Sequence, residues 1–264
     1  MIKSFFNYIV LTFEVVKLNI LSAMEYRIAF FTQVAGMVLN DFCWLFLWYL
    51  LFERFPSING WVLHDTLILF SFSMANYGLY KIFAGHTEEI SHDIANGNLD
   101  YFMTLPKSVL WQVSTSQTAI SAIGDFIFGV GLFLFLGFGW MQFFLYIFLC
   151  AMTALIFYSF SVILQSMAFY LGNFEETADR IFNMALGLTF YPATAFSGVV
   201  KFLTFTLLPV FFIVWLPVDL MKLFTWGKLG LLAGFALGIF LLARLLFNRG
   251  LRRYESGNLI NVKM

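Results

Sequence analysis

Residues 28–52 read IAFFTQVAGMVLNDFCWLFLWYLLF and form an apolar run that is long enough to cross a lipid bilayer as one helix. The whole chain of 264 residues has the same character, since 61% of its residues are hydrophobic and only 11% are charged. Soluble domains contain ~25% charged residues, so an ordinary water-soluble domain is excluded. The 15 basic and 15 acidic residues cancel, which argues against a nucleic acid partner. A single transmembrane domain over residues 1–264 is expected.

Further apolar runs follow at intervals along the chain and are separated by polar breaks. Together they predict an all-α polytopic membrane protein with six transmembrane helices. The expected spans lie at about 28–52, 63–84, 110–137 and 142–171, then from the polar break at 173–180 to about Gly198, and finally at 226–248. The third and fourth are expected to form a tight antiparallel hairpin, because the connection near Gly139 is very short.

The N-terminal residues 1–22 predict an amphipathic helix that lies along the membrane surface. Lys3, Asn7, Glu14 and Lys17 fall on one side of such a helix, and apolar residues occupy the remainder. The charges interrupt the apolar stretch that a secretory signal requires, so this helix is expected in the mature protein.

Residues 201–222, KFLTFTLLPVFFIVWLPVDLMK, are apolar, but two prolines interrupt them. The segment fits either a seventh crossing or a re-entrant helical hairpin. Basic residues are enriched on the cytoplasmic side of membrane proteins. Six crossings with both termini in the cytoplasm place 11 of the 15 basic residues inside, Lys263 in the C-terminal tail among them. An outer re-entrant hairpin is therefore expected.

Residues 85–108, GHTEEISHDIANGNLDYFMTLPKS, form the longest polar stretch and lie on the cytoplasmic side of this topology. They predict a short helix over about 87–96 that ends at Gly97. One interpretation is a solvated linker between two spans. Ile90, Ile94, Leu99 and Phe102 are more apolar than a linker requires, so exposed apolar surface for docking a cytoplasmic protein is favoured.

Three short motifs within this pattern resemble those of a known family. Residues 90–106 contain a G-x-L-D-x-x-[LM]-x-x-P pattern, residues 191–196 a Y-P-x-x-x-F pattern, and residues 208–217 an L-P-x(6)-[YL]-P pattern. In the same order they resemble ABC-2-type transporter permeases, in the branch related to antibiotic-export membrane subunits. The six-span pattern with an amphipathic start extends this resemblance over essentially the whole chain.

The resemblance implies a permease subunit of an ATP-driven exporter in the cytoplasmic (inner) membrane of a prokaryote. Residues 85–108 would act as a coupling helix on a separate ABC ATPase, present in two copies, and a second permease subunit, identical or homologous, would complete the pathway. No G-x-x-x-x-G-K-[ST] motif occurs, so no cofactor is expected in this chain, and ATP and Mg would be held by the partner. The residues expected to couple to the ATPase are Glu88, Glu89, Ile90, Asp93, Ile94, Gly97, Leu99, Asp100 and Pro106, with Met103 also in the motif.

The resemblance also implies a pathway between the two permeases, with an outer gate at the re-entrant segment. The candidates for pathway or gate are Asp41, Phe190, Tyr191, Pro192, Phe196, Pro209 and Pro217. Asp41 and Asp125 are acids within spans at similar depth, roughly 20 Å from the cytoplasmic end at about 1.5 Å per residue. Each is either a functional group or a protonated or hydrogen-bonded structural one.

Gly230, Gly234 and Gly238 lie one helical turn apart in the last span and predict a face for close helix packing, within the chain or between subunits. No metal site and no catalytic residues are expected. Two other functions remain open: a self-contained channel or ion-coupled secondary transporter, in which the broken segment 186–222 and the two acids form a midplane site, and, less favoured, an intramembrane enzyme. The cargo cannot be read from the sequence.

Overall fold

The computed structural model describes residues 2–58 and 60–254. The structure does not describe the Lys3 side chain, which was expected on the polar side of the N-terminal helix, or Lys263, which was expected on the cytoplasmic side. Helices make up the structure within these ranges, and they contain no strand: α1 (Ile2–Ala23), η1 (Met24–Tyr26), α2 (Arg27–Arg54), α3 (Leu63–Ala84), η2 (Gly85–Glu89), α4 (Ile90–Asn96), α5 (Leu99–Met103), α6 (Val109–Thr115), α7 (Ser121–Phe135), α8 (Trp140–Ser166), α9 (Ala168–Leu171), α10 (Glu175–Leu188), η3 (Ala193–Ala195), α11 (Gly198–Thr206), η4 (Phe211–Trp215, a π-helix), α12 (Leu216–Lys222) and α13 (Trp226–Leu251).

Four helical stretches in the described residues are long and apolar enough to cross a membrane, or five if the bent pair of α11 with η4 and α12 counts as one span. They contain α2, α3, α8 and α13. The helix α7 is also apolar but has only 15 residues, and α10 has 14. At about 1.5 Å per residue, neither covers a hydrocarbon core of ~30 Å. The all-helical membrane architecture is therefore present, whereas six full-length spans are not established.

The continuous span predicted over 110–137 is wrong, because residues 116–120 separate α6 from α7. This break contains Ser116 and Thr118, whose short side chains favour local hydrogen bonding over helix, and the Ser116 hydroxyl donates to the Val113 carbonyl at 2.8 Å. It packs against the end of α3, where the Ala119 N–H donates to the Lys81 carbonyl at 3.2 Å. A Cβ atom on Gly85 would come within 2.8 Å of Ala119 N, so the two backbones are in direct contact.

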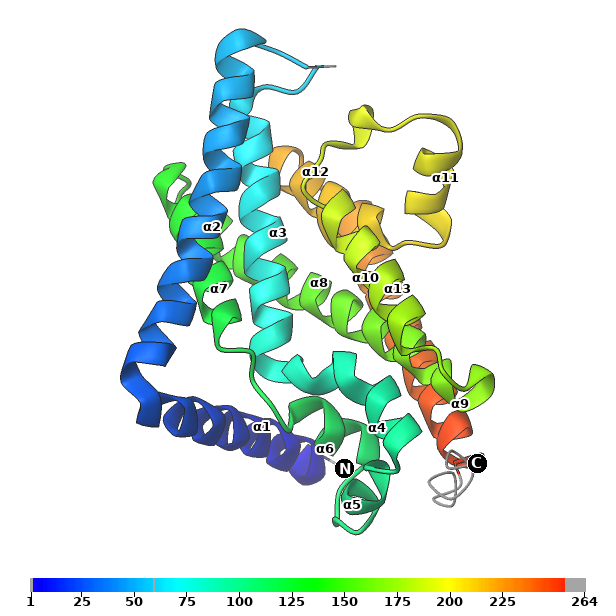
Figure 1. The fold of residues 1–264 in the computed structure, drawn as a ribbon. Helices are drawn as coiled ribbons and strands as arrows, with labels where there is room; N and C mark the ends of the chain where they lie inside the picture. Colours follow the sequence, from blue (N-terminus) through cyan, green and yellow to red (C-terminus); the bar gives the residue numbers. More distant parts are fainter. Residues whose placement is uncertain (1, 59, 255–264) are drawn as a thin grey trace.

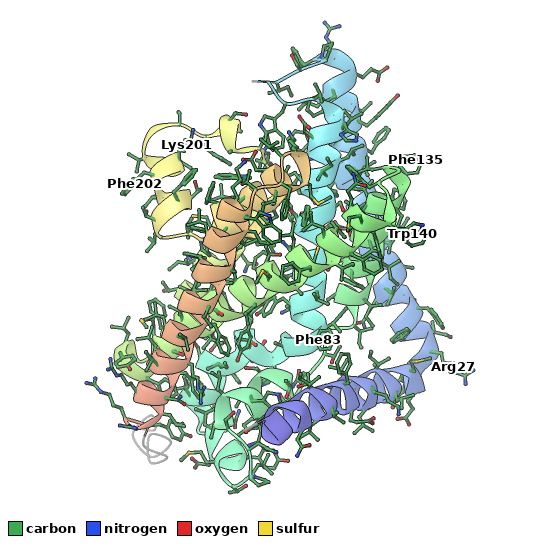
Figure 2. The ribbon with its side chains drawn as sticks, turned by 180° about the vertical axis from the view of Figure 1, so that it is seen from behind. Arg27, Phe83, Phe135, Trp140, Lys201 and Phe202 are labelled. Carbon is green, nitrogen blue, oxygen red and sulfur yellow. The ribbon has the colours of Figure 1, made fainter. Side chains whose placement is uncertain are left out.

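The helix α7 packs along α3 and α2, and it parts from α8 beyond the short turn that joins them (Figure 1). Figure 2 shows Phe135 and Trp140 on either side of this turn. The expected tight hairpin of the third and fourth spans is therefore limited to the turn itself. Two glycines explain the preference for α3, because a Cβ atom on Gly78 would lie 2.6 Å from Phe126 N and one on Gly129 would lie 2.5 Å from Ala75 N. Without side chains at these positions, the α3 and α7 backbones touch.

The helix α1 lies across the end of the bundle at which α4, α5, α6 and the end of α13 also lie (Figure 1). It turns sharply into α2 at η1, and Tyr26 leaves the helical conformation there with φ −101° and ψ 71°. The Phe13 ring meets the Phe83 ring at 5.4 Å, which fixes α1 against α3. The helix predicted over the N-terminal residues is present, while its position on a membrane surface stays a prediction.

The fifth predicted span is shorter than expected, because α10 ends at Leu188 and the chain is irregular before and after η3. Pro192 is extended at φ −65° and ψ 149°, which stops helix propagation. The helix α11 then stands to the side of the bundle, where Figure 2 labels Lys201 and Phe202. It is joined to η4 and α12 with a bend of 74°. A bend of this kind fits a broken span as well as a re-entrant segment.

The main core lies between α3, α8, α10, η4 and α12. It is rich in rings, as the Tyr80 and Phe157 rings stack at 6.1 Å and Phe182 contacts both. A second buried cluster lies at the α1 end of the bundle and involves α4, α8 and α13. This second cluster is the one that positions the candidate site.

Candidate functional site

Residues 85–108 fold into η2, α4 and α5 and form a structured surface beside α1 (Figure 1). Gly97 ends α4 with φ 77°, a left-handed conformation that glycine adopts without a steric penalty. Its N–H donates to the Asp93 carbonyl, and the Asn98 N–H donates to the same carbonyl at 3.0 Å. The predicted helix end at Gly97 is confirmed, although the helix begins at Ile90 and residues before it form a 3-10 turn.

The apolar residues of this segment point inward, so the expectation that they expose apolar surface is wrong. Ile90 and Leu99 are completely buried and Ile94 nearly so, while Phe102 is half-buried against the same cluster. They meet Val162, Ala168, Ala243 and Phe247, which α8, α9 and α13 supply. These three coupling candidates therefore anchor the segment to the bundle.

Hydrogen bonds fix the position of α4 against α8. The Ser91 N–H donates to Gln165 Oε1 at 3.1 Å, and the Ser91 hydroxyl donates to the Gln165 carbonyl at 3.0 Å. The Gln165 amide in turn donates to Asp179 of α10 at 2.9 Å. All groups of Ser91 and Gln165 that make these bonds are buried, so they link three elements in a site that excludes water.

Two of the four acids expected to be available for polar contacts are engaged within the chain. Glu88 pairs with Lys81 Nζ at 2.8 Å and accepts a bond from the Tyr80 hydroxyl at 3.3 Å. Asp93 is buried and lies 2.8 Å from His86 Nε2. Glu88 and Asp93 therefore have partners within the chain, and their contact with an ATPase stays a prediction.

The outward face of the segment consists of other residues. Glu89 and Asp100 are exposed, as is Pro106. Tyr101 is 65% exposed and Met103 is 50% exposed. We define Glu89, Asp100, Tyr101 and Met103 as the outer face. Asp100 also lies beside Tyr254, whose pKa is raised to about 12 by burial and by the Asp100 charge.

The end of the segment also contacts the surface helix α1. Lys107 Nζ lies 4.6 Å from the centre of the Tyr8 ring, and Trp111 Nε1 donates to the Thr12 hydroxyl at 3.0 Å. The Tyr8 and Trp111 rings also meet edge to face at 5.4 Å. A displacement of the outer face would therefore reach α1 directly.

The candidate gate residues come together around an aromatic side chain that sequence reasoning did not select. Trp215 Nε1 donates to the Tyr191 carbonyl at 2.9 Å, and its ring lies 5.9 Å from the Phe196 ring. Tyr191 also meets Trp48 of α2 at 5.7 Å, and Phe190 meets Trp44 of α2 at 5.8 Å. The irregular stretch around Pro192 thus connects α2 to η4. The sequence signal for Trp215 was its place two residues before Pro217, in the segment that the prolines interrupt.

The two prolines of the bent pair occupy different places. The Pro209 carbonyl accepts bonds from the N–H groups of Phe212 and Ile213, at 3.1 and 3.0 Å, and so opens the second helix. Pro217 lies in the first turn of α12, where its missing N–H is tolerated.

The glycines of α13 do not pack against another helix within the chain. Nothing lies within 4 Å of a Cβ atom built on Gly230, Gly234 or Gly238. Gly234 and Gly238 instead line an apolar pocket of about 550 Å³ between α13 and the α11 end. Among residues 2–58 and 60–254 no helix packs closely on this glycine face, and packing between subunits stays a prediction.

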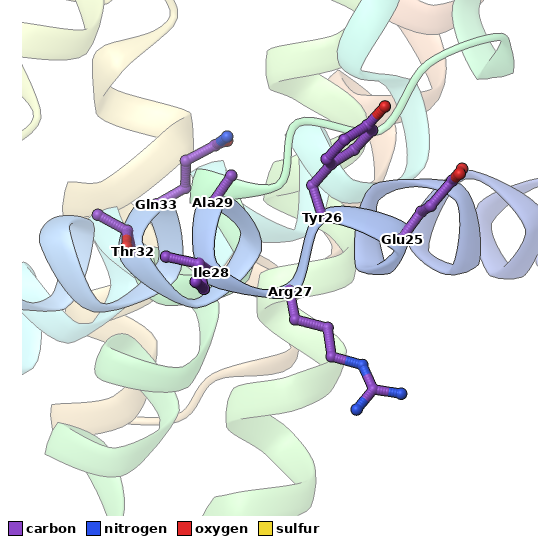
Figure 3. A pocket seen from close by; sticks show the side chains of 7 residues that line it. All are labelled: Glu25, Tyr26, Arg27, Ile28, Ala29, Thr32 and Gln33. Atoms are coloured by element: carbon purple, nitrogen blue, oxygen red, sulfur yellow. The ribbon is translucent and has the colours of Figure 1, made fainter.

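Another hollow, of about 770 Å³, lies at the bend between α1 and α2. Figure 3 shows that its lining, from Glu25 to Gln33, comes from one continuous segment. Tyr26 and Arg27 extend to different sides of the backbone in this view. It is therefore a surface feature of the bend, with no second element to enclose a ligand.

The acids Asp41 and Asp125 are brought together, which the sequence did not reveal. Each is 1% exposed, and their side chains face each other where α2 crosses α7. Among residues 2–58 and 60–254, no group of three or more His, Cys, Asp or Glu side chains is arranged to hold a metal ion. The two histidines of residues 85–108 have separate partners, since His86 pairs with Asp93 and His92 lies 3.5 Å from Glu175.

Comparison with known families gives one match. A family model described as an ABC-2 family transporter protein matches residues 38–257. This range includes α3, the whole of residues 85–108, the bent pair and α13. Neither the curated proteins nor the solved structures provided a match.

Proposed function

Because the chain belongs to the ABC-2 family of transporter proteins, we propose that it is the permease subunit of an ATP-driven exporter. In this proposal residues 85–108 dock onto a separate ABC ATPase, present in two copies, which holds ATP and Mg. A second permease, identical or homologous, completes the translocation pathway. The chain lies in the inner membrane of a prokaryote with both termini in the cytoplasm.

The observation that carries the proposal is the construction of residues 85–108. Their inner side is fixed by Ile90 and Leu99 in a buried cluster and by the bonds between Ser91 and Gln165. Their outer face presents an acid and two large apolar side chains, Asp100, Tyr101 and Met103, which are exposed in the part of the chain that the structure describes. Aromatic and Met residues are enriched in protein interfaces, so the outer face suits contact with a partner protein. Because the inner side is fixed to the bundle, a movement of that partner would be passed on to the transmembrane helices.

A route for the movement follows from the contacts. Displacement of the outer face would act on α3 through Lys81 and Glu88 and on α1 through Lys107 and Tyr8. Partway along α3, between Leu63 and Ala84, the Asn76 side chain bonds to the Ile213 carbonyl in η4. We place the outer gate at the bent pair and at the aromatic residues around Trp215, and the pathway on the open faces of α2 and of α13.

The test is purification of the tagged chain from its native membranes. An ATPase should copurify with the chain, in equal amount if the second permease is identical and in twice the amount if it is homologous. ATP hydrolysis by the complex should fall at least severalfold in Tyr101→Ala. A control is Glu53→Gln, an exposed change in the last turn of α2, at the other end of the bundle from residues 85–108. Transport by the purified chain with no ATPase present would contradict the proposal and favour a self-contained carrier.

A further inference from the structure

The carboxyl groups of Asp41 and Asp125 meet in a place that offers them no compensation. Asp41 is one of only three buried residues on α2, with Trp48 and Phe52. The approach of the helices is close here, because a Cβ atom on Gly124 would lie 2.7 Å from the Val34 carbonyl oxygen. The two side chains are therefore confined between backbones, away from water.

Three of the four carboxyl oxygens have no hydrogen-bond partner among the described residues: both oxygens of Asp41, and Oδ1 of Asp125. The other polar groups that face the pair are Asn40 from α2 and Tyr77 from α3. No lysine, arginine or histidine of the described chain forms an ion pair with either acid. The pair thus consists of buried acceptors that face each other, and three of their four oxygens accept no hydrogen bond from a described residue.

Two ionised carboxylates cannot persist in such contact. Each would lose its hydration without an opposite charge in return, which costs several kcal/mol per ion in proteins, and their mutual repulsion would add to this cost. A proton on one carboxyl group removes half of the charge and supplies the missing donor, as in pairs of carboxyl groups that share a single proton.

We propose that Asp41 and Asp125 form a proton-binding site within the membrane-embedded part of this chain, in which one shared proton joins α2 to α7. The proton is taken up from water on folding and stays between a carboxylic acid and a carboxylate. Its loss leaves two charges at the helix contact, so α2 is released from α7. Because α2 has few other buried side chains, its attachment to the bundle becomes dependent on pH.

This inference needs only the membrane-embedded fold, so it stands apart from the proposed role in export. Its direct test is infrared spectroscopy of the full-length chain in lipid nanodiscs at about pH 7. An ordinary Asp, with a pKa of about 3.9, is ionised at this pH. The wild type should show the C=O stretching band of a protonated carboxyl group. The band should shift in Asp41→Asn and in Asp125→Asn, because each change removes one of the two groups that share the proton, and it should be absent from the double variant Asp41→Asn/Asp125→Asn. A wild-type spectrum without the band, a band that is unchanged in both single variants, or a band that persists in the double variant would overturn the proposal.

Thermal unfolding provides a second readout with a defined sign. The native pair keeps a proton that unfolded Asp residues release, so native stability should decrease as pH rises above about 4, where an ordinary Asp ionises, until the native pair itself loses its proton. The double variant Asp41→Asn/Asp125→Asn should lack this part of the slope, whereas the exposed control Glu14→Gln should keep the wild-type slope. Equal slopes in wild type and double variant would contradict the proposal. So would a wild type whose stability at fixed pH depends on Na⁺, because the pair would then hold a metal cation.

Discussion

Asn76 of α3 donates a hydrogen bond from Nδ2 to the carbonyl oxygen of Ile213 at 3.0 Å. Ile213 lies four residues before Pro217, so its carbonyl is the acceptor that an α-helix would pair with the N–H that proline lacks. A fully buried side chain from one helix thereby replaces a backbone bond in another. The π-helix η4 is in this way attached to α3.

We expect Asn76→Ala to destabilise the protein by about 1–3 kcal/mol, because it leaves a buried carbonyl without this donor. The change should appear as a lower midpoint of thermal unfolding in detergent. In a Pro217→Ala background an N–H becomes available to the Ile213 carbonyl, so the same Asn76→Ala change should cost less. Equal costs in the two backgrounds would show that the two groups are not coupled.

The close contact of α3 with α7 gives a prediction about glycine. Gly78→Ala and Gly129→Ala each place a Cβ atom less than 3 Å from backbone of the other helix. The helices must separate, and overpacking of this kind typically costs about 1–3 kcal/mol. Gly131→Ala is the matched control on α7, because nothing lies within 4 Å of its Cβ position. Comparable loss of folded protein in all three variants would argue against the backbone contact.

The inner and outer sides of residues 85–108 should respond differently to mutation. Leu99→Ala removes a completely buried side chain and should cost about 2–5 kcal/mol of stability. Tyr101→Ala removes an exposed side chain and should change stability by less than about 0.5 kcal/mol, while it lowers affinity for the ATPase. Thermal unfolding and a pull-down with the ATPase separate the two effects. Loss of stability in Tyr101→Ala with unchanged binding would contradict this division.

The link from α4 to α10 through Gln165 leads to a prediction on coupling. Gln165→Leu keeps the size of the side chain and removes both of its polar contacts, to Ser91 and Asp179. We expect binding of the ATPase to persist while transport per ATP hydrolysed decreases severalfold, because α4 is then held less firmly against α8 and α10. A variant that transports with wild-type efficiency would exclude this link from the coupling route.

Much of the architecture follows from the sequence, because apolar runs of bilayer length and a glycine after a helix are local signals. These predicted α2, α3, α8 and α13, and the end of α4 at Gly97. The break at residues 116–120 did not follow, since it is held by the Lys81 carbonyl of another helix.

The candidate site was predicted in position and only partly in detail. The motif located residues 85–108, but the direction of Ile90 and Leu99 depends on apolar partners that α8 and α13 bring from more than 60 residues away in sequence. The contact between Asp41 and Asp125 could not be predicted for the same reason. The sequence indicated that the two acids lie at similar depth, but the rotation of each helix about its axis is set by packing at glycines such as Gly124.

The central claim, that the outer face of residues 85–108 receives a separate ATPase, is tested most directly by site-specific photo-crosslinking in intact membranes. A photoreactive amino acid replaces Tyr101 in one variant and Phe202 of α11 in the other, two side chains that are each 65% exposed and lie at different ends of the bundle (Figures 1 and 2). We predict a crosslink to a nucleotide-hydrolysing protein from position 101 and none from position 202. A crosslink to that protein from position 202, or its absence at position 101 in an assembled complex, would contradict the account.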